Sequence, residues 1–448
     1  MEQTPTKKSF RHYMYFLCGQ NFSMLGSLIV GFVITWWLTI ETGSAVILSI
    51  STFLMFIPQI VVTPFSGVIA DRWKKKNIIV ISDSLQAFVT FGLFLFFLID
   101  LQNIWLILGI NTLRAALFAF QLPAVQSLIP VMVPKKNLSR VNGVNFLFSG
   151  FIFTIGPVIA ATLLAFFPVT QIFLIDIWTF LIALVPLILI KIPKVHQVTE
   201  EATKKSMFKD FKTGLLTVKM IPGLFAMIAF AMIWNFIHRP WAVLLPYFVR
   251  YTHDGSAIDL ALLMTTSQVG NIVGSLIMSV KKTWKHKIKL NIIGASIFFI
   301  CQIPAILAPK GNFILMMIVL FPAWVILPIT VSTYLAILQT VVSKDKIGRI
   351  MSIDHMISMA IAPIGALIAG PLADFFGIIN LFLVFAILGM IHPFIIWGFT
   401  KIRQLEIIDR EIMAKDEEIA EGIEAPEVVE APEVVEAPEV VQVTETIE

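Results

Sequence analysis

Charged residues are scarce in this chain of 448 residues: Asp, Glu, Lys and Arg together make up 14% of it. A soluble globular protein carries about 25% charged residues, whereas 57% of this chain is hydrophobic and 38 residues are Phe. The low charge and the mean hydropathy of +0.87 exclude an ordinary soluble domain. They indicate that lipid surrounds most of the chain.

Cysteine is also rare, and motifs of soluble enzymes are missing. Cys18 and Cys301 lie far apart in apolar runs, so we expect neither a disulfide framework nor a metal site. The sequence contains no Walker loop and no nucleophile elbow, which argues against a transporter driven directly by ATP and against an esterase-like enzyme. We therefore predict a protein that is not an enzyme and that has no cofactor.

Long apolar runs occupy most of the chain. A run of about 20 apolar residues predicts a membrane-spanning helix, because a backbone in lipid must satisfy its own hydrogen bonds. The sequence therefore predicts an all-α membrane protein with twelve such helices, at about 13–40, 45–70, 77–99, 103–132, 138–166, 169–190, 221–249, 257–280, 289–308, 313–342, 349–374 and 378–400.

Basic residues are concentrated in alternate loops, which orients the helices. The only basic residues in the loops on the opposite side are Arg250 and Lys310. We therefore predict a multi-pass protein of the cytoplasmic membrane with both termini in the cytoplasm. The basic segments are Lys7 to Arg11, Arg72 to Lys76, Lys135 to Arg140, 191–219, Lys281 to Lys289 and Lys344 to Arg349.

The two halves of the chain are weakly related. "LSRVNGVNFLFSGFIFTIGP" from 138 matches "IGRIMSIDHMISMAIAPIGA" from 347 at a constant offset, and "TGSA" at 42 matches "DGSA" at 254. Similarity between two six-helix halves is typical of transporters built from repeats. We expect two pseudo-symmetric bundles at 1–190 and 221–402, joined by a cytoplasmic linker at 191–220.

The C-terminal residues have a different composition. Residues 424–441 contain three copies of "EAPEVV", and the whole segment from residue 403 is acidic. Such a composition cannot bury a hydrophobic core. The sequence therefore predicts a disordered acidic tail over 403–448.

The stretch "GVIADRWKKK" at 67–76 lies between the second and third predicted helices. It resembles the loop motif G-x-x-x-D-R-x-G-R-R/K of the major facilitator superfamily. Gly67, Asp71 and Arg72 match the motif directly, and Lys75 and Lys76 occupy its basic positions. The resemblance implies that these five residues form a conformational latch, in which Asp71 caps a helix of the other half.

Two interpretations of this motif remain open. A carboxylate at the C-terminal end of a helix is disfavoured by the helix dipole and needs a compensating partner, which fits the latch. A cytoplasmic basic anchor explains the lysines equally well, but it explains neither Gly67 nor Asp71. The corresponding loop of the second half, "SVKKTWKHKIK" at 279–289, has the cations without the Gly and Asp. We therefore expect the latch to be one-sided.

Further segments are similar to the macrolide-efflux and siderophore-export branch of proton-coupled drug antiporters. They are "TGSA", "PFSGVIADR", "RAALFAFQLPAVQSLIP", "GPVIAA" and "GALIAGPLADFFG". The resemblance implies Gly–Pro helix packing in the fifth and eleventh helices, at Gly156, Pro157, Gly365, Gly370 and Pro371.

Charged residues inside a membrane helix are costly, so each is a functional hypothesis. Arg114 lies about 16 Å into the fourth helix at 1.5 Å per residue, and Arg239 is central in the seventh, between His238 and Pro240. The resemblance implies that the first, fourth, seventh and tenth helices line a central cavity. We therefore place Arg114, Arg239 and His238 in the substrate and proton pathway; the alternative is a structural role between helices.

Carboxylates in the apolar runs are the candidates for carrying a proton. Asp176 lies in the sixth helix, Asp354 near the inner end of the eleventh, and Asp83 near the inner end of the third. We assign Asp176 and Asp354 to the same pathway, with interhelical hydrogen bonding as the alternative, and expect Asp83 to partner the basic loop. Weaker candidates for cavity contacts are Asn21 and Trp324, with Gln20 and Asn235.

Taken together, these patterns predict a monomeric secondary transporter in the lipid bilayer. It would export amphipathic organic small molecules in exchange for protons, without any nucleic-acid partner. Two central arginines without a matching carboxylate in the first helix favour an anionic substrate. The alternatives are solute uptake, lysophospholipid transport by the same fold, and a membrane receptor or scaffold that does not transport.

Overall fold

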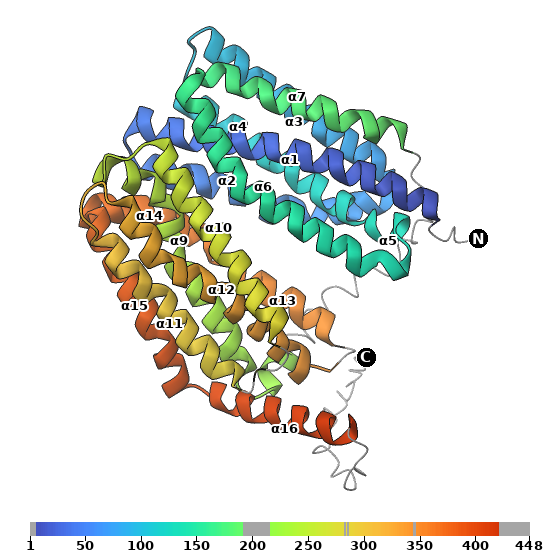
Figure 1. The fold of residues 1–448 in the computed structure, drawn as a ribbon, viewed down its shortest axis with the longest axis vertical. Coiled ribbons are helices and arrows are strands. Elements are labelled where there is room, and N and C mark those ends of the chain that lie inside the picture. The colour runs from blue at the N-terminus through green and yellow to red at the C-terminus, as the bar shows by residue number, and fades with distance from the viewer. Residues whose placement is uncertain (1–5, 191–215, 282–283, 285, 344–345, 421–448) are drawn as a thin grey trace, which may run out of the picture.

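The computed structural model describes residues 6–190, 216–281, 284, 286–343 and 346–420. Every regular element within these residues is helical (Figure 1). The helices before residue 190 are α1 (Lys7–Thr42), α2 (Ala45–Arg72), α3 (Lys75–Leu98), α4 (Ile104–Gln126), α5 (Ile129–Met132), the 3₁₀ turn η1 (Lys135–Asn137), α6 (Leu138–Phe166) and α7 (Val169–Leu189).

The remaining helices lie between residues 224 and 420. They are α9 (Leu224–Tyr247), the π-helical turn η3 (Phe248–Thr252), α10 (Ala257–Val280), α11 (Lys287–Ile306), α12 (Phe313–Val341), α13 (Ile347–Ala360), α14 (Ala362–Phe376), α15 (Ile378–Phe399) and α16 (Ile402–Ala420).

Twelve helices within the described residues are long and apolar enough to cross a membrane. This confirms the predicted number of membrane helices. Short polar side chains mark several of their starts: Asn103 caps α4, Ser256 caps α10 and Asn312 caps α12, each by accepting hydrogen bonds from free backbone N–H groups. Such caps are worth about 1 kcal/mol each.

Two of the predicted membrane runs are interrupted. The fourth run was expected to reach residue 132, but α4 ends at Gln126 and the short helix α5 follows; α5 carries a proline in its first turn, Pro130. The eleventh run divides into α13 and α14, and Pro363 stands in the first turn of α14. Proline lacks the N–H that would continue the preceding helix, so each break falls just before one.

The expectation of a disordered tail from residue 403 is wrong for its first part. Residues 402–420 form α16, which follows α15 after a short turn. Ile402 and Leu405 are fully buried, and Glu406 and Asp409 are 6% and 2% exposed. Because these four residues share one face of the helix, α16 docks through that face although its composition is acidic. The "EAPEVV" repeats at 424–441 lie outside the described residues.

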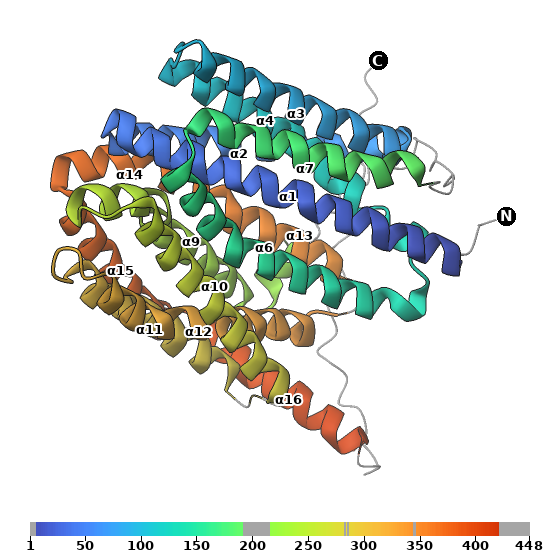
Figure 2. The same cartoon turned by 45° about the horizontal axis from the view of Figure 1, so that its top comes forward.

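We call the helices α1–α7 the first group and the helices α9–α15 the second group. In the first, α1 packs on α6 and α7, and α4 packs on α2 and α3; in the second, α12 packs on α10 and α11, and α9 packs on α14 and α15. The groups meet where α2 lies against α14 and where α6 lies against α10 (Figures 1 and 2).

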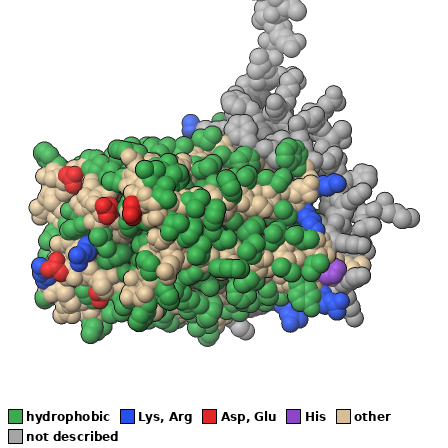
Figure 3. All heavy atoms as spheres, turned by 90° about the horizontal axis from the view of Figure 1, so that it is seen from above, with side chains coloured by type: hydrophobic (Ala, Val, Ile, Leu, Met, Phe, Trp, Pro, Cys, Tyr) green, Lys and Arg blue, Asp and Glu red, His purple; other side chains and the backbone are tan. Residues whose placement is uncertain are grey.

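The surface of the molecule is largely apolar, as expected for a membrane protein. The face in Figure 3 shows a broad hydrophobic band with charged side chains at its two ends. On this face, acidic side chains appear at one end only, together with basic ones, and the other end carries basic side chains and a histidine. Exposed Phe88, Leu147 and Ile314 are 71%, 71% and 69% accessible, which suits a lipid contact and not water.

Candidate functional site

The first group contains a buried ion pair. Arg114 of α4 donates from Nη2 to Oδ2 of Asp176 in α7 over 3.1 Å, and the two side chains are 8% and 4% exposed. The hydroxyls of Ser27 in α1 and Thr90 in α3 donate to the same carboxylate over 2.9 and 2.7 Å. Four helices therefore meet at Asp176, and the charge of Arg114 is neutralised within the first group.

A second polar network lies in the same group. Gln20 of α1 donates from Nε2 to Oδ2 of Asp83 in α3 over 3.0 Å. Gln121 of α4 donates to Gln20 over 2.9 Å, and Gln86 of α3 donates to Gln121 over 2.9 Å. Asp83, 4% exposed, is thus bonded to an amide of α1, although we expected it to partner the basic loop. Within the described residues it forms no ion pair.

Arg239 of α9 lies where the two groups meet. Its guanidinium carbon is 5.1 Å from the ring centre of Phe56 in α2, and Gly365 of α14 lies beside its Cβ. No ion pair of Arg239 occurs in the described part of the chain, and its Nε is buried without a hydrogen-bond partner. The two arginines therefore differ: the charge of Arg114 is compensated by protein, and that of Arg239 is not.

His238, the neighbour of Arg239, is enclosed by aromatic rings. Its ring stacks on Trp234 with centroids 5.1 Å apart, and Phe298 and Trp324 approach edge-on at 5.2 and 6.0 Å. Its Nδ1 is buried without a hydrogen-bond partner among the described residues. A donor or acceptor brought by a ligand would satisfy this nitrogen.

A small cavity of about 130 Å³ lies next to His238, between α9, α10 and α12. Its walls are almost entirely apolar, apart from the imidazole and one hydroxyl. Trp324, a sequence candidate for cavity contacts, is one of its walls. The lining residues are His238, Trp241, Ala242, Leu245, Leu263, Met264, Ser267, Leu320 and Trp324.

Asp354 of α13 is a buried carboxylate of another kind. The Tyr334 hydroxyl of α12 donates to its Oδ1, and the Ser358 hydroxyl donates to the same oxygen over 3.4 Å. Asp354 is 8% exposed, and within the described residues it has no ion pair. Its donors are neutral, in contrast to the guanidinium that binds Asp176.

Asn21 does not join any of these clusters. Its Nδ2 donates to the carbonyl of Leu17 one turn earlier in α1, over 2.9 Å. Gln20, its neighbour, takes part in the network of Asp83. The candidates of the sequence analysis are therefore divided between the two groups: Arg114 and Asp176 meet in the first, and Arg239, His238 and Trp324 gather in the second.

The latch motif is described only in part. Gly67, Asp71 and Arg72 lie in the last turns of α2, and their side chains are outside what the structure describes, so the latch stays a prediction. The Nζ of Lys75 donates to the carbonyl of Ser127, at the end of α4, over 3.2 Å. Lys76 donates to Ile188 and Ile190, at the end of α7, over 2.6 and 2.9 Å. Cations suit these free carbonyls because helix C-termini are negative.

Two of the predicted packing glycines lie within their own group. A Cβ at Gly156 of α6 would collide with the Leu28 side chain of α1, so the absence of a side chain lets these helices approach closely. Gly365 of α14 is similarly placed against α9, where a Cβ would lie 3.1 Å from that of Arg239. Pro157 lies inside α6, next to Gly156.

Gly370 of α14 packs across the two groups. A Cβ at this position would lie 2.5 Å from Cα of Val46 and 2.6 Å from the carbonyl oxygen of Ala45, at the start of α2. Pro371 follows it inside α14. Only a glycine permits this backbone contact between the groups.

Further contacts between the groups lie near the same end of the molecule. The Tyr251 hydroxyl of η3 is 3.2 Å from the carbonyl oxygens of Thr39 and Ile40, near the end of α1. Nearby in the second group, Lys310 donates to Asp254 over 2.6 Å and holds the pKa of that carboxyl below its ordinary value. The end where α1 joins α2 is therefore closed by direct contacts between the groups.

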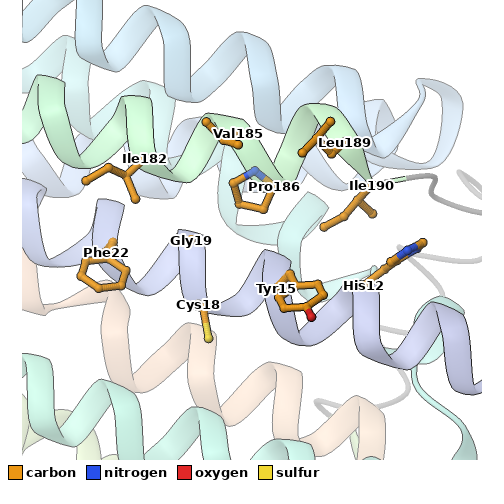
Figure 4. A pocket seen from close by; sticks show the side chains of 10 residues that line it. All are labelled: His12, Tyr15, Cys18, Gly19, Phe22, Ile182, Val185, Pro186, Leu189 and Ile190. Carbon is orange, nitrogen blue, oxygen red and sulfur yellow. The ribbon is translucent and has the colours of Figure 1, made fainter.

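A pocket of about 470 Å³ lies away from these clusters, between α1 and α7 (Figure 4). Its lining is apolar except at His12 and the Tyr15 hydroxyl, and it includes neither Arg114 nor Arg239 nor any of the predicted carboxylates. We therefore do not assign the substrate to it. The lining residues are His12, Tyr15, Cys18, Gly19, Phe22, Ile182, Val185, Pro186, Leu189 and Ile190.

The sequence analysis missed three hydroxyls of the site: Ser27, Thr90 and Tyr334. Ser and Thr are common in membrane helices, where they bond to neighbouring helices or to their own backbone, so their presence alone carries no signal. Tyr334 was the better candidate, because only 5 tyrosines occur in the chain. Within the described residues, no three His, Cys, Asp or Glu side chains are grouped to hold a metal ion.

Comparison with known proteins agrees with this architecture. A family model described as Major Facilitator Superfamily matches residues 16–362. Macrolide efflux protein A of Streptococcus pyogenes is 24% identical over 391 residues, covering 87% of this chain and 96% of the relative. The staphyloferrin A transporter of Staphylococcus aureus is 23% identical over 418 residues, covering 91% and 99%.

A solved structure shows the same fold. The crystal structure of a bacterial homologue of the iron transporter ferroportin, in an inward-facing state, superimposes with a TM-score of 0.67 at 15% identity, covering 87% of this chain and 99% of that one. The similarity to the macrolide-efflux and siderophore-transport branch, expected from short motifs, is confirmed by the relatives over most of the chain. The chain is a transporter and belongs to the Major Facilitator Superfamily.

Proposed function

We propose that the protein exports amphipathic organic small molecules across the cytoplasmic membrane by alternating access, as a proton antiporter. In this proposal the first and second groups are two pseudo-symmetric six-helix bundles that rock about a site between them. Efflux proteins among the relatives support export, and the basic loops support cytoplasmic termini and the cell membrane. One chain supplies both bundles, so we infer a functional monomer.

The observation that carries the substrate assignment is the unpaired charge of Arg239. Arg239 is partly buried, and an arginine withdrawn from water without a counter-ion is costly. A ligand carboxylate would supply the missing partner as well as acceptors for the guanidinium. The aromatic enclosure of His238 and the apolar cavity beside it suit the hydrophobic part of such a ligand. We therefore propose an amphipathic substrate with an acidic group.

Replacing Arg239 with Ala should weaken the binding of an amphipathic carboxylic acid by about 10- to 100-fold, because a hydrogen bond to a charged group contributes about 1.5–3 kcal/mol. Binding of the methyl ester of the same acid should change by much less. The affinities are measured by tryptophan-fluorescence titration of purified protein, with compounds taken from a screen in cells that express or lack the chain.

Arg239→Lys is the matched control, since it retains the charge and loses the planar donor pair. It should bind the acid better than Arg239→Ala does. Equal losses of affinity for the acid and for its ester in Arg239→Ala would overturn the proposal that Arg239 binds an acidic group. That result would not contradict the proposed transport function.

For proton coupling we favour Asp354 over Asp176. Protonation of Asp176 would break its ion pair with Arg114, whereas protonation of Asp354 only rearranges hydrogen bonds from neutral hydroxyls. A carboxylate that can gain and lose a proton without stranding a buried cation suits a repeated cycle.

Asp354→Asn should therefore abolish substrate movement driven by a pH gradient and preserve exchange of labelled for unlabelled substrate. The reason is that exchange needs the rocking motion but no net proton transfer. Proteoliposomes with an imposed pH gradient measure both fluxes, and the direction of accumulation distinguishes export from uptake. Tyr334→Phe, which leaves the carboxylate in place, should retain gradient-driven flux. A gradient response unchanged in Asp354→Asn would assign the proton to another group.

A further inference from the structure

The helix α16 lies against the ends of α9, α11, α12 and α15 in the second group (Figures 1 and 2). Its buried face begins with Ile402 and Leu405, which join the core of that group, and continues with Glu406 and Asp409. Two nearly inaccessible carboxylates on a docking face need cationic partners. The cationic partners of Glu406 and Asp409 therefore identify the part of the second group to which α16 binds.

Both carboxylates pair with residues at the start of α11. Lys287 donates from Nζ to Oδ1 of Asp409 over 2.8 Å, and their side chains are 7% and 2% exposed. His286 lies 3.1 Å from Glu406, which also accepts from Arg410 over 2.9 Å. The Lys287–Asp409 pair is thus fully desolvated, and removing either partner would leave a buried charge.

Lys287 occupies the same place in its group as Lys75 does in the first. Lys75 is the first residue of α3 and Lys287 the first residue of α11. The separation, 287 − 75 = 212, equals that between "TGSA" and "DGSA", 254 − 42 = 212. Lys75 donates to a helix-end carbonyl of its own group, and Lys287 donates to a carboxylate of α16.

The loop from 279 to 289 contains no acidic residue. We propose that α16 supplies the carboxylate that this loop lacks, and that Asp409 is a positioning residue for transport. By binding Lys287, it fixes α16 to the start of α11, so that the two helices move together when the groups rock. This proposal rests on the proposed transport function, because the rocking motion is what it serves.

The first experiment exchanges the two charges. Asp409→Lys and Lys287→Asp should each slow transport by about tenfold, since coupling between contacting charges is typically of that size, and leave the substrate KM unchanged. The double variant, Lys287→Asp with Asp409→Lys, should recover most of the rate. Recovery would identify the ion pair itself as the relevant contact; a double variant as slow as the single variants would overturn the proposal.

A second double variant separates positioning from folding. Lys287→Met with Asp409→Leu replaces the ion pair by apolar side chains, a change that commonly preserves or raises stability. We expect its thermal unfolding to match that of the unchanged protein while its transport stays slow, because apolar contacts can slide where an ion pair cannot. A transport rate equal to that of the unchanged protein would show that the pair only stabilises the fold.

A readout independent of transport completes the test. Backbone hydrogen exchange at residues 286–290 should become faster in Asp409→Asn and should stay slow in Arg403→Ala, whose side chain is exposed on the same helix. If the unchanged protein shows no flux but exchange in this segment is faster in Asp409→Asn, the proposed transport function is wrong and the role of the Lys287–Asp409 ion pair in holding the segment is supported. If exchange is unchanged in Asp409→Asn, the ion pair does not hold this segment, whatever the flux.

Discussion

Replacing Asp176 with Ala will lower the free energy of unfolding by about 3–5 kcal/mol, because it leaves Arg114 buried without a counter-ion. The pair is 3.1 Å apart and nearly inaccessible, so water cannot take the place of the carboxylate. Ser27 and Thr90 would also lose their acceptor. The loss is measured by denaturant titration of the purified protein in detergent micelles.

Removing both charges gives the control for this experiment. The double variant Arg114→Met with Asp176→Leu has no stranded cation, and we expect it to be considerably more stable than Asp176→Ala alone. If Asp176→Ala loses less than about 1 kcal/mol, the value for an exposed pair, then Arg114 finds another partner and the ion pair does not hold α4 to α7.

Replacing Gly370 with Leu will prevent the two groups from closing where α2 meets α14, and transport will be lost. A Cβ at this position would lie 2.5 Å from Cα of Val46 and 2.6 Å from the carbonyl oxygen of Ala45. Both atoms belong to the backbone of α2, which cannot move aside without shifting a whole helix. Overpacking typically costs about 1–3 kcal/mol. This penalty destabilises only the conformation in which α2 and α14 are in contact.

The conformation in which α14 touches α2 should therefore be the less populated one in Gly370→Leu. Spin labels placed near Thr42 and Asp254, in a background with Cys18 and Cys301 replaced by Ser, report the distance between the groups by pulsed electron resonance. Longer distances should dominate in the variant, and flux into proteoliposomes should fall in parallel.

Gly398→Leu is the matched control, because no heavy atom would lie within 4 Å of a Cβ at that position in α15. It should transport like the unchanged protein. Normal flux in Gly370→Leu would show that the contact between α14 and α2 opens and closes without this backbone approach.

Local patterns predicted the membrane helices well, within a few residues at most ends, since each span must satisfy its backbone within lipid. Local patterns gave wrong predictions at the break between α4 and α5 and at the helix α16. The break between α4 and α5 depends on how Pro130 is accommodated, and apolar composition gives no warning of it. The helix α16 was missed for the opposite reason: its acidic residues suggested a solvated tail, and the face formed by Ile402, Leu405 and Asp409 becomes meaningful only beside Lys287.

The candidate site divides in the same way. The sequence identified Arg114 and Arg239 as the arginines inside predicted helices and could not distinguish their roles, because an intramembrane arginine is unusual wherever it occurs. The structure separates them through Asp176, which lies 62 residues from Arg114 along the chain. Pairing at that distance depends on how α4 and α7 are rotated toward each other, and no local pattern encodes it.

By itself, therefore, the sequence determined the class of protein, the number of membrane helices and the superfamily, because hydropathy and a short loop motif are properties of contiguous residues. Only the tertiary structure decided which buried or partly buried charges are compensated: Arg114 by Asp176, Lys287 by Asp409, and Arg239 by no residue in the described part of the chain. The physical reason is that the free energy of a buried charge depends on atoms within a few ångströms, and those atoms belong to helices that the chain brings together from far apart.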